Sequence, residues 1–470
     1  MKKMLMALSL SGALLGGSAV VWAEEAASTP ATEQTVAASD TVAETVTTVV
    51  AETTAPAEAA PAPEETSTAD TGDTAWILVS TALVLLMTIP GLALFYGGMV
   101  RKKNVLSTMM FSLSAAILVS LIWVIVGYSL AFSGTGAYVG DLAKAMLNGV
   151  AFDALSGTIP ESLFVIFQMT FAIITVAIIS GSIADRMKYS AFMAFIAIWV
   201  ILVYAPITHW VWAADGWLFK AGALDFAGGT VVHINAGVAG LVAAYMLGKR
   251  TGLGRESMAP HNLTLTVIGA SLIWVGWFGF NGGSALGAGA RASMAILVTQ
   301  VAAAAAAFSW LLVERLIRGK ASVLGGASGA VAGLVVITPA AGFVGVGGAL
   351  IMGLIGGVVC FWGITALKRL LKADDALDAF GLHAVGGIVG AVLTGIFYSD
   401  EIIKAAGVVL APTFAGQLWV QIEGVLATIV YSGVVTFIIL KVIDLVIGIR
   451  VSADDERMGL DLSQHGERIE

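Results

Sequence analysis

The stretch DFAGGTVVHINAGVAGLVAAYML, residues 225–247, and the stretch DALDAFGLHAVGGIVGAVLTGIF, residues 375–397, follow one pattern. In each, an Asp precedes a His by eight positions, and glycines follow that His at the fourth and seventh positions. The copies lie 150 residues apart, and each is almost wholly apolar from its His onward. A histidine at the same place in two apolar copies indicates a duplicated protein in which each half contributes one ionisable side chain.

The composition of the whole chain indicates a membrane protein. Of its 470 residues, 58% are hydrophobic and 12% are charged, whereas a soluble globular chain is about 25% charged. Apolar runs of about 20 residues recur along the chain, and each is long enough to cross a hydrocarbon layer roughly 30 Å thick. The 55 glycines are spread through these runs, where small residues let helices approach closely. The composition therefore predicts an all-α polytopic membrane protein.

Eleven transmembrane helices are expected from the apolar runs. They are 76–99, 105–133, 161–184, 189–212, 226–247, 261–281, 292–314, 322–340, 344–366, 379–399 and 418–447. A second repeat relates GLALFYGG, residues 91–98, to GWFGFNGG, residues 276–283. Spans 1–5 and 6–10 are therefore predicted to be two five-helix repeats, inverted because five is odd, with an extra C-terminal helix. Transporters of this kind bind substrate at the repeat interface, near the membrane midplane.

The N-terminal region carries signals of export. Residues 1–23 resemble a signal peptide, with Lys2 and Lys3 at the start, an apolar stretch, and a small-x-small site at its end. An uncleaved anchor helix is the alternative. Residues 24–74 are rich in Ala, Thr and Pro and carry acidic groups without any Lys or Arg. They are predicted to be a disordered acidic periplasmic segment, because they cannot bury enough apolar surface to order.

The basic residues predict the orientation of the membrane domain, residues 75–447. One alternate set of loops contains fourteen Lys and Arg residues, whereas the opposite set contains four, Lys144, Lys220, Arg291 and Lys404. Loops rich in Lys and Arg face the cytoplasm. The prediction is therefore a multi-pass protein of the cell inner membrane with its mature N-terminus in the periplasm. Residues 448–470 become a cytoplasmic tail.

Two of the five histidines lie within predicted spans at matching positions, His233 in span 5 and His383 in span 10. A two-fold axis in the membrane plane would bring them together. An ionisable residue inside the membrane indicates a functional site, although a packing role for the pair and ligation of a b-type haem remain open. His209, His261 and His465 lie near span ends or in the tail, and we expect them to be held by local polar contacts.

The surroundings of the two histidines favour a neutral ligand. Removal from water disfavours the charged imidazolium, so a dry pore would keep both rings neutral, each with one donor and one acceptor nitrogen. Such rings could bond to each other and to a small polar molecule beside them, while a bare cation would gain much less. This chemistry suits ammonia better than a metal ion. We expect no metal and no cofactor, and Cys360, the single cysteine, cannot form an internal disulfide.

Four segments carry a family resemblance. In order they are ALFYGG (93–98), DFAGGTVVH (225–233), GWFGFN (276–281) and FGLH (380–383). They resemble the signature segments of bacterial members of the Amt/Mep/Rh ammonium transporter family, and the resemblance runs from about residue 75 into the tail. The family implies ammonium uptake through a twin-histidine pore, without enzymatic activity.

The resemblance also implies roles for individual residues. Trp212 resembles the aromatic face that binds NH4+ at the outer mouth, and Ser284 and Phe167 resemble its other contacts. Phe167 and Phe280 resemble the stacked gate below that site. Asp225 resembles the residue that organises the outer site through hydrogen bonds, while its repeat mate Asp375 is interpreted as a structural cap. NH4+ would lose its proton at the mouth, and NH3 would pass His233 and His383, with or without that proton.

The same resemblance implies partners. It predicts a homotrimer in membrane lipid, ammonium or its analogue methylammonium as substrate, a PII-type signal protein on the cytoplasmic loops, and no nucleic acid. Three rival functions remain open at this point. They are a channel for water, glycerol or urea, a redox protein with haem between His233 and His383, and an ammonium sensor.

Overall fold

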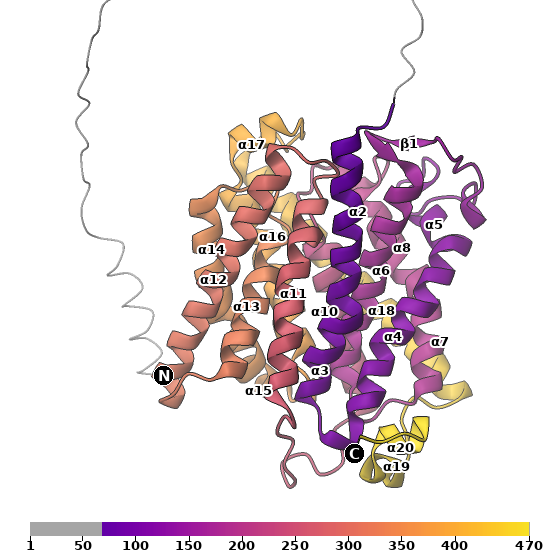
Figure 1. Ribbon diagram of the computed structural model, residues 1–470, viewed down its shortest axis with the longest axis vertical. Coiled ribbons are helices and arrows are strands. Elements are labelled where there is room, and N and C mark those ends of the chain that lie inside the picture. The colour runs from indigo at the N-terminus through magenta and orange to yellow at the C-terminus, as the bar shows by residue number, and fades with distance from the viewer. Residues whose placement is uncertain (1–67, 470) are drawn as a thin grey trace, which may run out of the picture. The chain divides into compact units, whose positions relative to one another are not determined.

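The computed structural model describes residues 68–469, which form a bundle of long helices (Figure 1). The predicted signal peptide, residues 1–23, lies outside the described residues. So does most of the predicted acidic segment, of which only 68–74 is described. The membrane domain and the tail can therefore be followed completely except for residue 470.

The structure is all-α apart from two very short strands. Its main helices, in chain order, are α2 (Thr71–Leu86), α3 (Ala93–Met99), α4 (Val105–Ile122), α5 (Tyr128–Phe132), α6 (Glu161–Ile183), α7 (Tyr189–Trp199), α8 (Ala205–Trp212), α9 (Trp217–Lys220), α10 (Asn235–Leu247), α11 (Leu263–Gly283), α12 (Ala290–Arg318), α13 (Val323–Ile337), α14 (Val346–Trp362), α15 (Lys368–Leu371), α16 (Val385–Phe397), α17 (Asp400–Ala405), α18 (Phe414–Val446), α19 (Ala453–Met458) and α20 (Leu460–His465). The strands are β1 (Leu155–Ser156) and β2 (Ile159–Pro160), paired antiparallel.

Short wide turns of π-helix join several of these helices into continuous spans. They are η1 (Met87–Leu92), η3 (Trp123–Gly127), η5 (Val200–Tyr204), η6 (Gly229–Ile234), η7 (Gly363–Leu367) and η8 (Phe380–Ala384), and the remaining η2 (Lys102–Asn104) and η4 (Ala145–Leu147) are 3-10 turns. π-Helical turns inside α-helices are frequently found at functional sites. The two pore-candidate histidines both lie on such turns, His233 on η6 and His383 on η8.

The expected count of eleven spans is only partly reproduced. Among residues 68–469, ten helical stretches are long and apolar enough to cross a membrane. The eighth expected span, 322–340, contains α13, which has 15 residues, fewer than the roughly 20 that a lipid-exposed span needs. The C-terminal two-thirds of α13 is buried among other helices. Irregular backbone at membrane depth is tolerated where protein surrounds it.

The two repeats cross each other at spans 5 and 10. η6 packs against α16, and η8 packs against α10, so each π-helical turn contacts the α-helix of the other repeat. The motif glycines make this crossing close. A Cβ on Gly237 would lie 2.5 Å from the backbone nitrogen of Ala384, and one on Gly387 would lie 2.7 Å from the carbonyl oxygen of Gly229. Larger residues at these positions would separate the two histidine-bearing segments.

The ends of the bundle differ in their secondary structure. One end, which we call the β1 end, contains the two strands and α17, and the other, the tail end, contains α15, α19 and α20 (Figure 1). Span 5 begins at the β1 end, whereas span 10 begins beside α15 at the tail end. The two histidine-bearing segments therefore run in opposite directions, as an inverted repeat requires.

Buried ion pairs join the loops at the tail end. Arg101 pairs with Asp185 at 3.1 Å, and Arg250 pairs with Asp374 at 2.8 Å and Asp185 at 3.6 Å. Burial alone would raise the pKa of Asp374, but hydrogen bonds and charge from Arg250 outweigh it, and the pKa lies below its ordinary value. A buried charge that lost its partner would destabilise the fold strongly. The network therefore joins the loop that follows span 5 to the loop that precedes span 10.

The C-terminal tail is tied to the same loops. The Asp461 carboxylate accepts hydrogen bonds from the backbone nitrogens of Leu106 (3.1 Å) and Ser107 (2.7 Å) at the start of α4. Glu456 accepts bonds from the backbone nitrogen and the hydroxyl of Thr251 at 2.6 and 2.9 Å. The tail thus caps one helix and holds the loop after span 5.

Candidate functional site

His233 and His383 contact each other at the crossing of the two repeats. Their Nδ1 atoms lie 3.2 Å apart, and their ring centroids are 5.3 Å apart with planes inclined by 23°. Both side chains are buried. The contact joins the two positions related by the 150-residue repeat.

The π-helical turn that carries His233 is held by Asp225. Its carboxylate accepts hydrogen bonds from the backbone nitrogens of Gly228 (3.0 Å), Gly229 (2.5 Å), Thr230 (2.9 Å) and Val231 (3.2 Å), and from the Thr230 hydroxyl. The first N–H groups of a helix have no partner within it, and a carboxylate there is also favoured by the helix dipole. Asp225 therefore fixes where the histidine-bearing helix begins.

Asp375 does the same for His383 at the opposite end. Its carboxylate accepts bonds from the backbone nitrogens of Ala379 (3.2 Å) and Phe380 (2.9 Å) and from the Ser182 hydroxyl (2.6 Å). These contacts fit the interpretation of Asp375 as a cap. The eight-residue spacing from Asp to His thus sets the depth of each imidazole along its helix.

A narrow cavity of about 10 Å³ lies beside the histidine pair. Apart from the two imidazoles and the Trp277 indole, its walls are apolar side chains such as Leu92, Ile178 and Val331. Such a volume accommodates about one water-sized molecule. The Nε2 atom of His233 has no hydrogen-bond partner among the described residues. The site therefore offers a free imidazole nitrogen to one small polar molecule in apolar surroundings.

Trp277 holds the orientation of the His233 imidazole. Its ring stacks on His233 with a centroid separation of 5.4 Å and an interplanar angle of 19°. The Trp277 Nε1 donates a hydrogen bond to the Thr338 hydroxyl at 2.9 Å. Sequence reasoning did not single out Trp277, although it directly follows Gly276 of the span 6 repeat.

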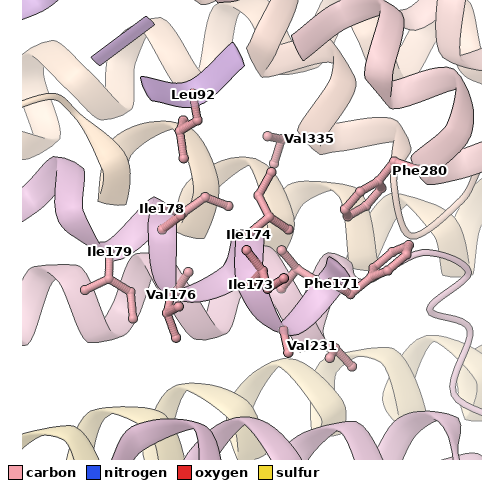
Figure 2. Packing of buried hydrophobic residues seen from close by; sticks show 14 of the residues in the cluster. Leu92, Phe171, Ile173, Ile174, Val176, Ile178, Ile179, Val231, Phe280 and Val335 are labelled. Carbon is pink, nitrogen blue, oxygen red and sulfur yellow. The ribbon is translucent and has the colours of Figure 1, made fainter. Parts of the chain in front are cut away.

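The rings of Phe167 and Phe280, predicted to stack on each other, are not direct neighbours in the structure. The ring that lies against Phe280 is that of Phe171, with centroids 4.3 Å apart and planes inclined by 31°, and Figure 2 shows these two rings side by side. Phe167 contacts Phe171 edge-on at 5.0 Å instead. Phe167 and Phe171 are one turn apart on α6, so they share a face, and only the crossing with α11 decides which of them meets Phe280.

The aromatic rings form a continuous series from the β1 end to the histidines. Trp212 contacts Phe171 at 5.7 Å with an interplanar angle of 87°. Phe171 contacts Phe280, and Phe280 contacts His233 at 6.0 Å. Trp212 therefore lies on the β1-end side of the Phe171–Phe280 ring pair, and the histidines lie on its other side.

Ser284 and Phe167 lie beside the outer face of the ring pair. The Ser284 hydroxyl donates to the Phe280 carbonyl oxygen at 2.7 Å, which leaves its lone pairs as acceptors. A Cβ added to Gly283 would lie 2.9 Å from the Phe167 ring, so Phe167 lies close to the residue that precedes Ser284. The Trp212 Nε1 donates to the Asp225 carbonyl oxygen at 2.8 Å, which links Trp212 to the cap of span 5.

The other three histidines make local contacts. Both ring nitrogens of His209 lie within hydrogen-bond distance of backbone carbonyls, those of Ala131 (2.9 Å) and Gly136 (2.5 Å). His261 contacts the Val100 carbonyl at 3.2 Å, and His465 packs edge-on against Tyr189. A haem between His233 and His383 does not fit, because the rings touch and the adjacent cavity holds about one water-sized molecule.

Comparison with known proteins gives consistent matches over the membrane domain and tail. The model of the Ammonium Transporter Family matches residues 75–469. An ammonium transporter of Bacillus subtilis is 52% identical over 399 residues, covering 84% of this chain and 98% of that protein. An ammonium transporter of Aquifex aeolicus is 48% identical over 401 residues, covering 85% and 93%.

Solved structures give a similar result. The crystal structure of Saccharomyces cerevisiae Mep2 has a TM-score of 0.77 and 37% identity, covering 83% of this chain and 89% of that one. A structure titled Sensor Amt Protein has a TM-score of 0.78 and 30% identity, covering 84% and 98%.

Proposed function

Because the chain belongs to the ammonium transporter family and moves ammonium across a membrane, we propose a route for the substrate through the described residues. NH4+ is captured at the β1 end by Trp212, Ser284 and Phe167. At the ring pair of Phe171 and Phe280 it gives its proton to water at the β1 end, and NH3 passes His233 and His383. Like its relatives, which are ammonium transporters, the chain is a transporter and not an enzyme.

The outer site suits a cation. An indole face attracts an ammonium ion through its quadrupole, and the Ser284 hydroxyl supplies an acceptor because its own proton is donated to Phe280. Phe167 adds a second aromatic wall beside Ser284. These groups stabilise NH4+ in partly dehydrated form without a full negative charge, so they hold the ion while still allowing it to give up its proton.

The cavity below the ring pair suits a neutral molecule. Its walls are apolar apart from the two imidazoles and one indole, and a cation without a counter-charge is strongly disfavoured there. NH3 is close in size to water, so the volume of about 10 Å³ admits about one such molecule at a time. This contrast between the two sites is the reason to place the loss of the proton between them.

The histidine contact is the observation that carries the proposal. A hydrogen bond between two Nδ1 atoms requires one of them to donate and the other to accept. If both rings are neutral, one ring then presents an acceptor at Nε2 and the other presents an N–H donor there. Ammonia both donates and accepts, so it can bond to each ring in turn, which a bare metal cation cannot do.

The first prediction concerns capture at Trp212. Trp212→Leu should weaken ammonium capture by about 0.5–2 kcal/mol, the range of a cation–π contact, which corresponds to a KM raised roughly 2- to 30-fold. Uptake of labelled methylammonium into vesicles at low concentration measures this change. Trp419→Leu is the matched control, because Trp419 is an exposed residue of α18.

An unchanged KM in Trp212→Leu, with the normal amount of protein in the vesicles, would remove Trp212 from the capture site. The same vesicles test the rival function of a channel for other neutral solutes. The unmodified protein should take up methylammonium while excluding glycerol and urea. Passage of glycerol or urea at a comparable rate would contradict the proposed route.

We also propose that the protein lies in a cell inner membrane, with the β1 end toward the periplasm and the tail end toward the cytoplasm. The support is the excess of Lys and Arg in the tail-end loops. A homotrimer with three separate pores belongs to the same proposal and rests on the family resemblance. Cross-linking of the purified protein in lipid nanodiscs would determine the number of copies.

The second prediction concerns a PII-type signal protein at the tail end, within loops 248–257, 315–320 and 367–375. Arg250 and Asp374 are buried in ion pairs, so the exposed Arg255, Arg315 and Lys320 define the candidate surface. PII should co-purify with the membrane protein from ammonium-shocked cells, and Arg255→Glu with Arg315→Glu should reduce its recovery several-fold by charge repulsion. PII that stays soluble beside unmodified protein would refute the interaction. A signalling role alongside transport, as the name of one structural neighbour suggests for that protein, would use the same surface.

A further inference from the structure

A second cavity, with a volume of about 300 Å³, lies at the β1 end beside the candidate capture site. Trp212 lines it together with the aromatic residues Tyr128, Phe132 and Phe164, and Lys144 and Glu161 also face it. Trp212 therefore belongs both to this cavity and to the ring series that leads to the histidines. None of the other five residues has a part in the proposed route.

The carboxylate of Glu161 is the main charged feature of this cavity. Glu161 is the first residue of α6 and is 6% exposed. The Tyr128 hydroxyl donates to its Oε1 atom at 2.7 Å, and the Lys144 ammonium is ion-paired with the same oxygen. The carboxylate also lies at the N-terminus of α6, the end at which the helix dipole attracts anions. The cavity thus holds a buried carboxylate whose ion-pair partner is the partly exposed Lys144, and the Asp215 carboxylate, which pairs with Lys220, also lines it.

The aromatic walls around this carboxylate form a cage. The Tyr128 and Phe132 centroids are 5.7 Å apart, those of Phe132 and Phe164 are 5.1 Å apart, and those of Tyr128 and Phe164 are 6.3 Å apart. The Lys144 Nζ lies 5.8 Å from the Tyr128 ring centroid, within the range of a cation–π interaction. The alkylammonium group of Lys144 is therefore already held by the carboxylate and the Tyr128 ring together.

We propose that Glu161, Tyr128, Phe132 and Phe164 form a second cation site for ammonium and alkylated ammonium ions, with Lys144 as a built-in competitor. The proposal rests on the proposed function, in which the β1 end is the entrance. Lys144 is displaceable because its side chain is 32% exposed and its charge could remain in water. A cation that displaced it would gain the same carboxylate and rings, a combination that recognises quaternary ammonium ions in other proteins.

The sizes of the two cavities make the site testable. A volume of about 300 Å³ admits tetramethylammonium, whereas the cavity at the histidines, about 10 Å³, does not. Tetramethylammonium should therefore bind at the entrance without being transported. Because Trp212 of the capture site lines the cavity that contains the cage, the bound ion should block access to it and inhibit methylammonium uptake competitively.

Removal of the competitor provides the decisive experiment. A tethered group acts at an effective concentration of about millimolar, so Lys144→Met should strengthen inhibition by tetramethylammonium by roughly ten-fold. Lys144→Gln should do the same, while Glu161→Gln should weaken the inhibition. The double variant Lys144→Met with Glu161→Gln should lose the gain of Lys144→Met. Lys404→Met is the control, since Lys404 is an exposed lysine of α17 at the same end.

A direct measurement separates this site from the transport route. Titration calorimetry of tetramethylammonium into full-length protein in nanodiscs should detect binding that is strengthened in Lys144→Met and persists in Trp212→Leu. Lys144→Met and Lys144→Gln proteins that fold and transport normally could leave both the inhibition constant and the binding isotherm unchanged. That result would overturn the proposal. The ion pair of Lys144 and Glu161 would then only anchor the start of α6. That outcome is independent of whether Trp212→Leu changes the KM for methylammonium.

Discussion

Replacing both His233 and His383 by Ala is expected to reduce ammonium transport to the rate of empty vesicles. The variant would leave an apolar passage without any donor or acceptor, so ammonia would have to give up all its hydrogen bonds to cross it. An unpaired polar group in an apolar environment costs several kcal/mol, and each 1.4 kcal/mol lowers a rate about ten-fold. Ammonium-driven currents and methylammonium uptake in reconstituted vesicles measure the effect.

Acidic replacements should change selectivity instead of abolishing flux. His233→Asp or His383→Glu would place a carboxylate in the cavity, and Coulomb attraction in low dielectric favours a desolvated cation there. K+ should then permeate or compete with ammonium, whereas the unmodified protein ignores it. A K+ gradient across the vesicles, with no ammonium present, detects the change as a current.

His261→Ala is the control for these variants, because His261 is a partly buried histidine at the tail end that contacts only a backbone carbonyl in the described structure. Oligomer assembly should be verified for each protein by size-exclusion chromatography. A double Ala variant that assembles and retains the original rate and selectivity would show that the two histidines only pack the helices.

The second large effect is expected at Asp225. Asp225→Ala would leave the four backbone N–H groups at the start of the span 5 helix without their acceptor in a buried environment. Each unsatisfied buried donor costs about 1–3 kcal/mol, so the variant should lose at least about 3 kcal/mol of stability together with transport. Thermal unfolding in detergent, followed by tryptophan fluorescence, measures the loss.

Two further variants test the physical reason for this loss. Asp225→Asn keeps one acceptor oxygen and should be milder than Asp225→Ala. Asp215→Ala should have little effect, because Asp215 is a partly exposed residue near the same end that pairs with an exposed lysine. If Asp225→Ala were as stable as Asp215→Ala, the assignment of Asp225 as the cap that positions His233 would be wrong.

Much of the fold follows from the sequence because hydropathy and the repeat act on long segments. The 150-residue repeat alone places His233 opposite His383, and the apolar runs agree with the observed spans to within a few residues at most ends. The sequence could not show that α13 is shorter than a full span. Its apolar run continues through residues 338–344, which form turns buried among the other helices. Hydropathy shows which segments can be buried, but it does not show whether lipid or other helices surround them.

The contacts between individual side chains of the site could be predicted from the sequence only in part. Phe167 and Phe171 differ by one helical turn, and the sequence cannot show which of them faces α11. The pairing of Lys144 with Glu161 depends on the loop that contains β1 and β2, whose path no periodicity encodes. The capping contacts of Asp375 could be anticipated because the Asp and the histidine belong to one continuous segment, whereas the same role of Asp225 was not anticipated from the sequence.

The contact between the C-terminal tail and the start of α4 has a consequence for biosynthesis. Asp461 caps the start of α4 from a position 355 residues later in the chain. At a synthesis rate of about 5–20 residues per second, that helix start waits some tens of seconds on the ribosome before its acceptor is made. Until then every nascent copy presents uncapped N–H groups at the start of α4. A copy that ends before Asp461 never acquires this acceptor, so the start of its α4 helix stays uncapped, unlike that of a finished chain.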